Sequence, residues 1–359
     1  MGEPTTGDDA PQHAFIRGRG TAENPADRFT ELLVERDPEA PPDAPPTVVY
    51  VDHSRTLLSK NDSPDLPFEW SANPYRGCEH GCVYCYARPT HEYLGLSAGL
   101  DFETKLFAKQ DAPKLLRAEL SKPKWEPKVV AFSGVTDCYQ PVERTLKIMR
   151  GCLEVMAELR HPTGIVTKSA LVTRDIDLLQ ELARHRAVMV CITVTTLDDE
   201  LAAALEPRAA RPMKRLETIE TLTRAGVPVA VMVAPVIPGL TDHEIPAILA
   251  AAAARGATRS GWQLLRLPYG VKDLFAAWLA RWRPDRAEKV LHRIRELHDG
   301  KLNEAQFGKR MRGEGPFAEQ LDRLFKVFAK KHGLLQRRYD LDASSFRRPA
   351  PAQGNLFGA

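Results

Sequence analysis

Short apolar runs alternate with helix-like segments from residue 47 to residue 282, and this alternation constrains the fold more than any other feature of the chain. Near-continuous apolar runs such as VAVMVAPV are typical of parallel strands that helices cover on both faces. Six strand–helix units therefore predict an α/β protein, a TIM-like (β/α)6 barrel or partial barrel. The predicted strands cover residues 68–72, 128–132, 164–167, 188–194, 229–236 and 261–267, and the predicted helices cover residues 112–121, 142–160, 174–185, 211–225 and 244–255.

The segments on either side of this core differ from it in composition. Residues 1–46 hold eight prolines and ten acidic against four basic residues, so we expect a disordered acidic tail. Residues 283–345 are expected to form a basic helical extension, and residues 346–359 a flexible tail. Residues 281–350 hold eighteen basic against ten acidic residues, which suits either a solvated helix surface or a stripe that faces nucleic acid. The helices expected in the extension cover residues 287–298, 303–311 and 317–332.

The sequence indicates neither a membrane protein nor a secreted one. It contains no run of about eighteen uncharged apolar residues, which a membrane-spanning helix needs. The N-terminus is acidic and lacks the apolar core of a signal peptide. We therefore expect a cytoplasmic protein, with no membrane contact, whose six cysteines are reduced.

Three of the six cysteines lie within eight residues, in the stretch NPYRGCEHGCVYCYA, with the spacing C-x3-C-x2-C. Three thiolates on a short loop can hold three irons of a cubane iron–sulfur cluster and leave the fourth iron without a protein ligand. A structural zinc site needs four ligands, and His91 is the only Cys or His that follows the motif within thirty residues. A disulfide would leave an odd cysteine in a reducing compartment. The spacing therefore predicts a [4Fe–4S] cluster with one open iron, held by Cys78, Cys82 and Cys85.

The cysteine motif, with Tyr84 directly before its last cysteine, resembles that of the radical S-adenosylmethionine (SAM) superfamily. The resemblance implies a cluster loop after the first strand of a partial (β/α)6 barrel. It also implies that the open iron binds the amino and carboxylate groups of SAM. One electron from the cluster then cleaves SAM to methionine and a 5′-deoxyadenosyl radical.

Four further stretches extend the resemblance over about residues 70–270: FSGVTDCYQPVE, TKSALVTRDIDLL, LEPRAARPMKRL and VAPVIPGLTDHEI. Together with the cysteine motif they are similar to the spore photoproduct lyase-like group, often labelled DNA repair photolyases. This similarity implies an enzyme that acts on nucleic acid with lyase-like chemistry. The alternatives are a radical enzyme that modifies a peptide or small metabolite, and a non-catalytic iron–sulfur redox sensor or scaffold.

Functional residues of such barrels lie at the C-terminal ends of the strands. The resemblance implies that Tyr84 lies against the adenine of SAM, and Arg208 can pair with its carboxylate. The second strand ends with a single glycine where the superfamily usually carries a Gly-Gly-Glu-like motif. Packing or surface roles are the alternatives at each position. The expected cofactor-binding residues are Tyr84, Ser133, Gly134, Thr136, Lys168, Ser169, Thr193, Arg208 and Val233.

Cys138 and Tyr139 are the candidate catalytic residues. Spore photoproduct lyases use a cysteine near this strand end to donate a hydrogen atom to the product radical. In our alignment that cysteine precedes the aspartate, whereas Cys138 follows Asp137, so a small packing residue is the alternative. Tyr75, Tyr86 and Tyr139 are expected around the barrel mouth, where a tyrosine can stack on a base, relay a radical or simply pack.

Two kinds of partner follow from the resemblance and from the tail. We expect nucleic acid as substrate and a reductase or flavodoxin-type protein as electron donor. The tail residues Gln353, Leu356 and Phe357 resemble the Q-x-x-L-F peptide with which bacterial DNA proteins bind the sliding clamp. Such peptides work because a flexible tail inserts an apolar pair into a preformed groove.

Overall fold

A seven-stranded sheet forms the centre of the computed structural model, which describes residues 16–29, 45–335 and 341–348. The strand order is β10-β9-β8-β7-β6-β3-β2, and all neighbours are parallel except β2 (Leu58–Lys60), which runs antiparallel to β3. The six parallel strands are the six that the sequence predicts, so the α/β partial barrel is confirmed. They are β3 (Trp70–Ala72), β6 (Val130–Phe132), β7 (Thr163–Thr167), β8 (Val188–Thr193), β9 (Val229–Val236) and β10 (Arg259–Leu264).

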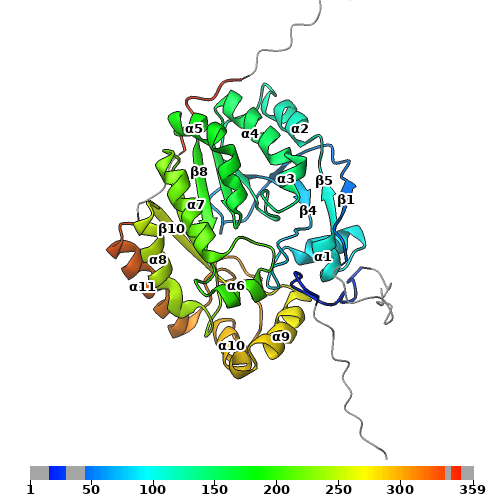
Figure 1. The fold of residues 1–359 in the computed structure, drawn as a ribbon, viewed down its shortest axis with the longest axis vertical. Helices are drawn as coiled ribbons and strands as arrows, with labels where there is room; N and C mark the ends of the chain where they lie inside the picture. The colour runs from blue at the N-terminus through cyan, green and yellow to red at the C-terminus, as the bar shows by residue number, and fades with distance from the viewer. Residues whose placement is uncertain (1–15, 30–44, 336–340, 349–359) are drawn as a thin grey trace, which may run out of the picture.

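Helices connect consecutive parallel strands, as the alternation predicts, and surround the sheet in Figure 1. One predicted helix, 142–160, is interrupted: α3 (Glu143–Leu146) ends and α4 (Ile148–Leu159) begins on either side of Lys147, whose φ is 53°. The buried Glu143 carboxylate accepts a hydrogen bond from Met149 N (3.0 Å) and so caps the start of α4. The other connecting helices are α2 (Ala112–Leu120), α5 (Ile176–Arg184), α6 (Asp199–Leu205), α7 (Pro212–Arg224) and α8 (Ile245–Ala254).

A second, three-stranded sheet with the order β1-β5-β4 lies at the opposite edge of the molecule from α8 in Figure 1, and the sequence did not predict it. It comprises β1 (Val48–Val51), β4 (Tyr75–Arg76) and β5 (Lys105–Ala108), with α1 (Leu100–Thr104) directly before β5. All four residues of β1 are exposed, so they lack the in–out alternation that marks a half-buried strand.

Residues 16–29 differ from the disorder expected for residues 1–46. Ile16 is buried, and Arg19 Nη1 donates to the carbonyl oxygen of Glu103 (3.0 Å). Arg28 pairs with Glu92 (2.5 Å) at the far end of the segment. Specific polar contacts therefore hold a segment that contributes little apolar surface.

The basic extension begins after α9 (Val271–Trp282), and it packs on the barrel through α10 (Pro284–Leu297) and α11 (Gly315–Lys331). The helices expected at 287–298 and 317–332 are confirmed, but the one expected at 303–311 is wrong, because these residues form turns that bond to the end of β10. There, Met311 O accepts from Leu264 N (2.9 Å). Residues 346–348 also differ from the expected flexible tail, since Arg347 N donates to Leu159 O (2.8 Å). Among the helices that the structure describes, none combines the length and apolar character needed to cross a bilayer.

Candidate cofactor site

The cysteine loop lies between β4 and the 3-10 helix η1 (Arg88–Leu94), just beyond the C-terminal end of β3. Cys78 and Cys82 are buried, Cys85 is half-buried, and none of the three forms a disulfide. Backbone hydrogen bonds fix the loop: Cys78 N donates to Phe102 O (2.9 Å), and Cys85 N donates to Cys82 O (3.2 Å). The three thiols are thus held on one preformed turn.

Two glycines allow this turn. Gly77 has a φ of 76°, and a Cβ there would lie 2.8 Å from Leu106 Cδ2 and 2.9 Å from Phe102 O. Gly81 has a φ of 66°, and a Cβ there would lie 2.7 Å from the Glu103 carboxylate. Both positions require a residue without a side chain.

The buried Glu103 carboxylate clamps the loop from outside. It pairs with Arg88 (2.5 Å), and Arg88 Nε donates to Cys82 O (2.9 Å). The same carboxylate accepts from Gly20 N (2.9 Å) and Thr21 N (3.1 Å) of the N-terminal segment. Hydrogen bonds therefore run from residues 20–21 through Glu103 and Arg88 to a cysteine of the loop.

The donor set suits a cubane cluster. Within the ranges that the structure describes, no three His, Cys, Asp or Glu side chains surround a position for one metal ion. A cubane requires a different arrangement, because each of its three thiolates binds a separate iron. Burial raises the pKa of Cys78 and of Cys82, so both are thiols until metal binding displaces the proton. His80, the nearest further donor, lies 3.4 Å from Asp137.

Three predicted cofactor-binding residues, Ser133, Gly134 and Thr136, follow directly after β6. Ser133 has a φ of 70°, and its Oγ accepts from Cys138 N (2.9 Å). Gly134 O accepts from the Tyr86 hydroxyl (2.6 Å), which joins this strand end to the residue after the last cysteine. Thr136 Oγ1 donates to the backbone of β4, at Tyr75 O (2.8 Å). Gly134 and Thr136 therefore contact residues on either side of the cysteine loop, whereas Ser133 bonds within its own turn.

Of the remaining predicted cofactor-binding residues, Lys168 and Arg208 lie near the cysteine loop, and the others make contacts elsewhere. Lys168 Nζ lies 5.9 Å from the centre of the Tyr84 ring. Arg208 N donates to the carbonyl oxygen of His80 (3.2 Å), and its side chain pairs with Glu79 (3.0 Å), so it contacts the cysteine loop itself. Ser169, Thr193 and Val233 make other contacts: Ser169 Oγ accepts from Leu171 N, Thr193 O accepts from Arg215, and Val233 lies in the core.

Cys138 and Tyr139 are wholly buried in the main hydrophobic core. The Tyr139 hydroxyl donates to Asp175 Oδ2 (3.1 Å). Tyr75 is buried too, with its hydroxyl on Glu143, so of the three tyrosines expected around the mouth Tyr86 is the one with an exposed ring. This placement suits the packing alternative for Cys138 and Tyr139, and their catalytic roles stay predictions.

Sequence reasoning missed three buried residues that organise the site. Gln140 brackets Cys78, because its Oε1 accepts from Glu79 N (2.8 Å) and its Nε2 donates to Gly77 O (3.1 Å). Glu206 accepts from the Tyr84 hydroxyl and pairs with Arg215. All three lie within the quoted stretches FSGVTDCYQPVE and LEPRAARPMKRL, which was the only signal available.

The Glu206 carboxylate carries a strongly perturbed pKa. Burial alone would raise it, but the Arg215 guanidinium, with Lys168 and the hydroxyls of Tyr84 and Thr195, brings the pKa to about 2. Thr195 Oγ1 donates to Glu206 (2.7 Å). An ionised carboxylate therefore lies at the hydroxyl of Tyr84 at neutral pH.

A model of the radical SAM superfamily matches residues 72–252, which include the cysteine loop and most of the sheet. The chain belongs to the radical SAM superfamily. Members of this superfamily use a [4Fe–4S] cluster and SAM, and the three cysteines of the loop are the side chains that fit the cluster. This chain is therefore a radical SAM enzyme.

Its similar relatives are largely uncharacterized. A protein of Mycobacterium tuberculosis is 39% identical over 235 residues, which cover 65% of this chain and 68% of that protein. A protein of Methanocaldococcus jannaschii is 30% identical over 172 residues, covering 48% and 62% of the two chains. A Pseudomonas phage M6 protein named radical SAM Nalpha-GlyT isomerase is 26% identical over 173 residues, covering 48% and 34%.

Among solved structures, the fold is similar to that of spore photoproduct lyase. The structure of that lyase complexed with dinucleoside spore photoproduct aligns over 80% of both chains, with a TM-score of 0.58 and 15% sequence identity. A Cys-to-Ser variant of the lyase aligns equally well, at 16% identity. The shared architecture therefore extends beyond the region that the superfamily model matches.

A pocket of about 210 Å³ opens beside the cysteine loop. Tyr86, which follows the last cysteine, forms one part of it, and η1, the segment after β10 and Arg28 of the N-terminal segment form the rest. Exposed tyrosine rings dominate the lining: Tyr86 is 43% exposed, Tyr93 72% and Tyr269 59%. The lining residues are Arg28, Tyr86, Pro89, Thr90, Tyr93, Arg266, Pro268 and Tyr269.

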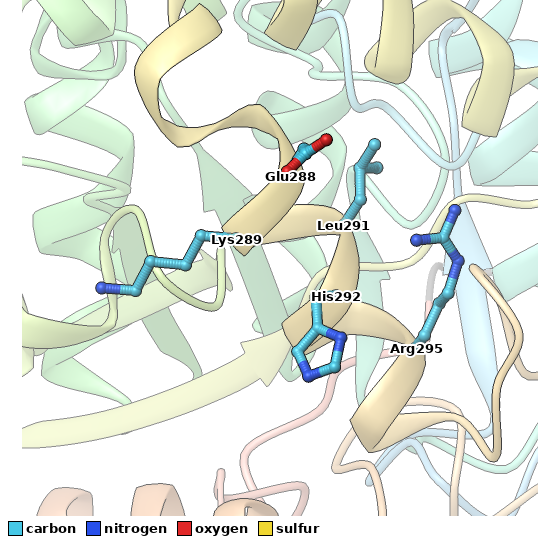
Figure 2. Close-up of a pocket in the computed structure, with 5 residues that line it drawn as sticks. All are labelled: Glu288, Lys289, Leu291, His292 and Arg295. Carbon is cyan, nitrogen blue, oxygen red and sulfur yellow. The ribbon is translucent and has the colours of Figure 1, made fainter.

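A larger hollow lies on α10, but its lining residues all come from that one helix. In Figure 2 its side chains spread over the surface of a single helix, with Lys289 and Arg295 pointing to opposite sides. Within the part of the chain that the structure describes, no second element supplies a lining residue, so this hollow is an open face of α10. Its lining residues are Glu288, Lys289, Leu291, His292 and Arg295.

Proposed function

We propose that this radical SAM enzyme acts on nucleic acid and that its target is a base held in the pocket beside the cysteine loop. The observation that carries the proposal is one pocket lined by three exposed tyrosine rings, Tyr86, Tyr93 and Tyr269, of which Tyr86 directly follows the last cluster cysteine. Proteins that hold unpaired bases stack them on aromatic side chains of this kind, which is worth about 1–3 kcal/mol per base.

Two further observations support a nucleic-acid substrate. The lyase with the similar fold has a solved structure in complex with dinucleoside spore photoproduct. The basic extension contributes exposed cations, because Arg286, Lys289 and Arg295 of α10 are exposed. Cations on the surface of a nucleic-acid enzyme contact backbone phosphates and make its binding depend on salt.

The chain's own residues divide the work between cofactor and substrate. When bound, the cluster and SAM supply one-electron reductive cleavage of the sulfonium group. Cys78, Cys82 and Cys85 hold the cluster, and Glu206 fixes the Tyr84 ring next to it. The pocket lined by Tyr86, Tyr93 and Tyr269 positions the base beside the cysteine loop, so that the substrate lies next to the cofactor. Lyase-like chemistry on a damaged pyrimidine is the reaction we propose.

The test combines binding with cofactor cleavage. Reconstituted, anaerobic enzyme is expected to bind single-stranded DNA with an affinity that falls steeply with salt, and to form more 5′-deoxyadenosine with ultraviolet-irradiated DNA than without it. Tyr93→Leu should weaken binding, whereas Tyr50→Leu, which alters an exposed tyrosine on β1, should not. Cleavage of SAM without any DNA binding at low salt would overturn the proposal and leave a peptide or metabolite as substrate.

A further inference from the structure

The tyrosine pocket contains a guanidinium without a counter-ion. Arg266 lies just beyond the end of β10, and its guanidinium carbon is 5.3 Å from the centre of the Tyr86 ring. Its Nε is buried and has no hydrogen-bond partner. Across residues 16–29, 45–335 and 341–348, the Arg266 side chain makes no hydrogen bond and no ion pair.

The other arginines near this pocket are already neutralised. Arg28 pairs with Glu92 (2.5 Å) and stacks on the Tyr269 ring at 3.6 Å. Arg310 pairs with Asp65 (2.6 Å). These pairs leave no carboxylate in contact with Arg266, and the pocket lining includes no Asp or Glu.

Burial and the nearby Arg310 charge lower the pKa of Arg266 and outweigh the opposing effects of Tyr86 and of Asp65, the carboxylate that pairs with Arg310. A half-buried positive charge is costly unless it is paired, so the site favours an anion. A guanidinium presents parallel N–H donors that match the oxygens of a phosphate or carboxylate. Because Arg266 contacts the Tyr86 ring and shares its pocket with Tyr93 and Tyr269, the fitting anion is one that carries a flat ring beside it.

We propose that Arg266 binds one backbone phosphate of the substrate, next to the base stacked on the tyrosines. This inference rests on the proposed function and deepens it, since the pocket then takes a nucleotide within a strand rather than a free base or nucleoside. The N-terminal segment takes part, because Arg28 closes one wall of the pocket and holds the Tyr269 ring.

A phosphate scan tests the assignment. The probe is a short oligothymidylate in which each phosphate in turn is replaced by a neutral methylphosphonate, bound to reconstituted holoenzyme at low salt. Wild-type enzyme is expected to lose about 10- to 100-fold in affinity at a single position, the range of one charge-assisted hydrogen-bonded contact. Arg266→Gln should bind the unmodified probe that much more weakly and should lose nothing further at that position.

Two control variants separate this contact from general charge effects. Arg286→Gln removes an equal charge from the exposed face of α10 and should leave the sensitive position unchanged. Arg266→Lys keeps the charge without the planar fork and should restore part of the affinity. An unchanged cluster absorption spectrum in each variant shows that the cysteine loop is intact.

The outcomes are distinct. If wild-type enzyme binds oligothymidylate but Arg266→Gln shows the same sensitive position as wild type, the phosphate contact is wrong and the nucleic-acid substrate stands. If wild-type enzyme binds no oligonucleotide, the proposed function fails and the phosphate contact fails with it.

Discussion

Replacing Glu206 by Gln is expected to destabilise the protein by about 3 kcal/mol, because it strands a buried cation. Glu206 and Arg215 are both buried, and Arg215 Nη2 donates to Glu206. The pKa of Glu206 is lowered from 4.5 to about 2, a difference that corresponds to roughly 3 kcal/mol at neutral pH. This agrees with the roughly 3–5 kcal/mol lost when one member of a buried ion pair is removed.

A double-mutant cycle tests that reasoning. Urea unfolding of the anaerobic protein at pH 7, followed by tryptophan fluorescence, gives the free energy of unfolding for Glu206→Gln, Arg215→Met and the double variant. The double variant should cost clearly less than the two single variants together, because it removes the stranded charge. Glu217→Gln breaks the exposed Lys214 pair and serves as the control, with little expected change. Strictly additive single effects, or a Glu206→Gln cost below about 1 kcal/mol, would refute the argument.

Three other predictions follow from the described contacts. Gly77→Ala should abolish cluster incorporation, measured as bound iron, whereas Gly95→Ala, at a similar φ of 67° with no atom within 4 Å, should retain the cluster. Glu103→Gln should lower the free energy of unfolding, measured by urea denaturation, by about 3 kcal/mol, because it leaves the buried Arg88 charge without its partner. An unchanged urea midpoint would contradict a stabilising role for the Glu103–Arg88 pair. Burial lowers the pKa of His161 from 6.5 to about 4 in the folded protein. As the pH falls through this range, the imidazole is protonated in the unfolded chain before it is protonated in the folded protein, which favours unfolding. Stability should drop by roughly 2 kcal/mol between pH 7 and pH 5 through this group, and His161→Gln should flatten that drop in pH-dependent unfolding curves.

The sequence was sufficient for the central sheet because strands such as β8 and β9 are apolar runs and helices alternate with the parallel strands. It was insufficient where long-range polar bonds decide the structure. Composition predicts disorder for residues 16–29, yet Glu103 and Glu92 hold that segment from more than sixty residues away. The turns at 303–311 likewise depend on the end of β10, which no local periodicity reveals.

In the candidate site, too, features that are local in the sequence could be predicted, and contacts between distant residues could not. The spacing of three cysteines identifies the cluster ligands because the ligands are neighbours in the chain. Glu206 and Arg215 are separated from Tyr84 by more than a hundred residues, and their contact depends on the way that α6 and α7 meet the loop. Burial of a charged residue, which marks such a network, is not visible in a single sequence.

Anaerobic reconstitution followed by dithionite reduction and SAM addition tests the central claim most directly. The reduced [4Fe–4S] cluster should change its electron paramagnetic resonance spectrum when SAM is added and should yield 5′-deoxyadenosine, and alanine at Cys78, Cys82 or Cys85 should remove both. Protein that takes up zinc in place of iron, or a cluster whose spectrum is indifferent to SAM, would contradict the account.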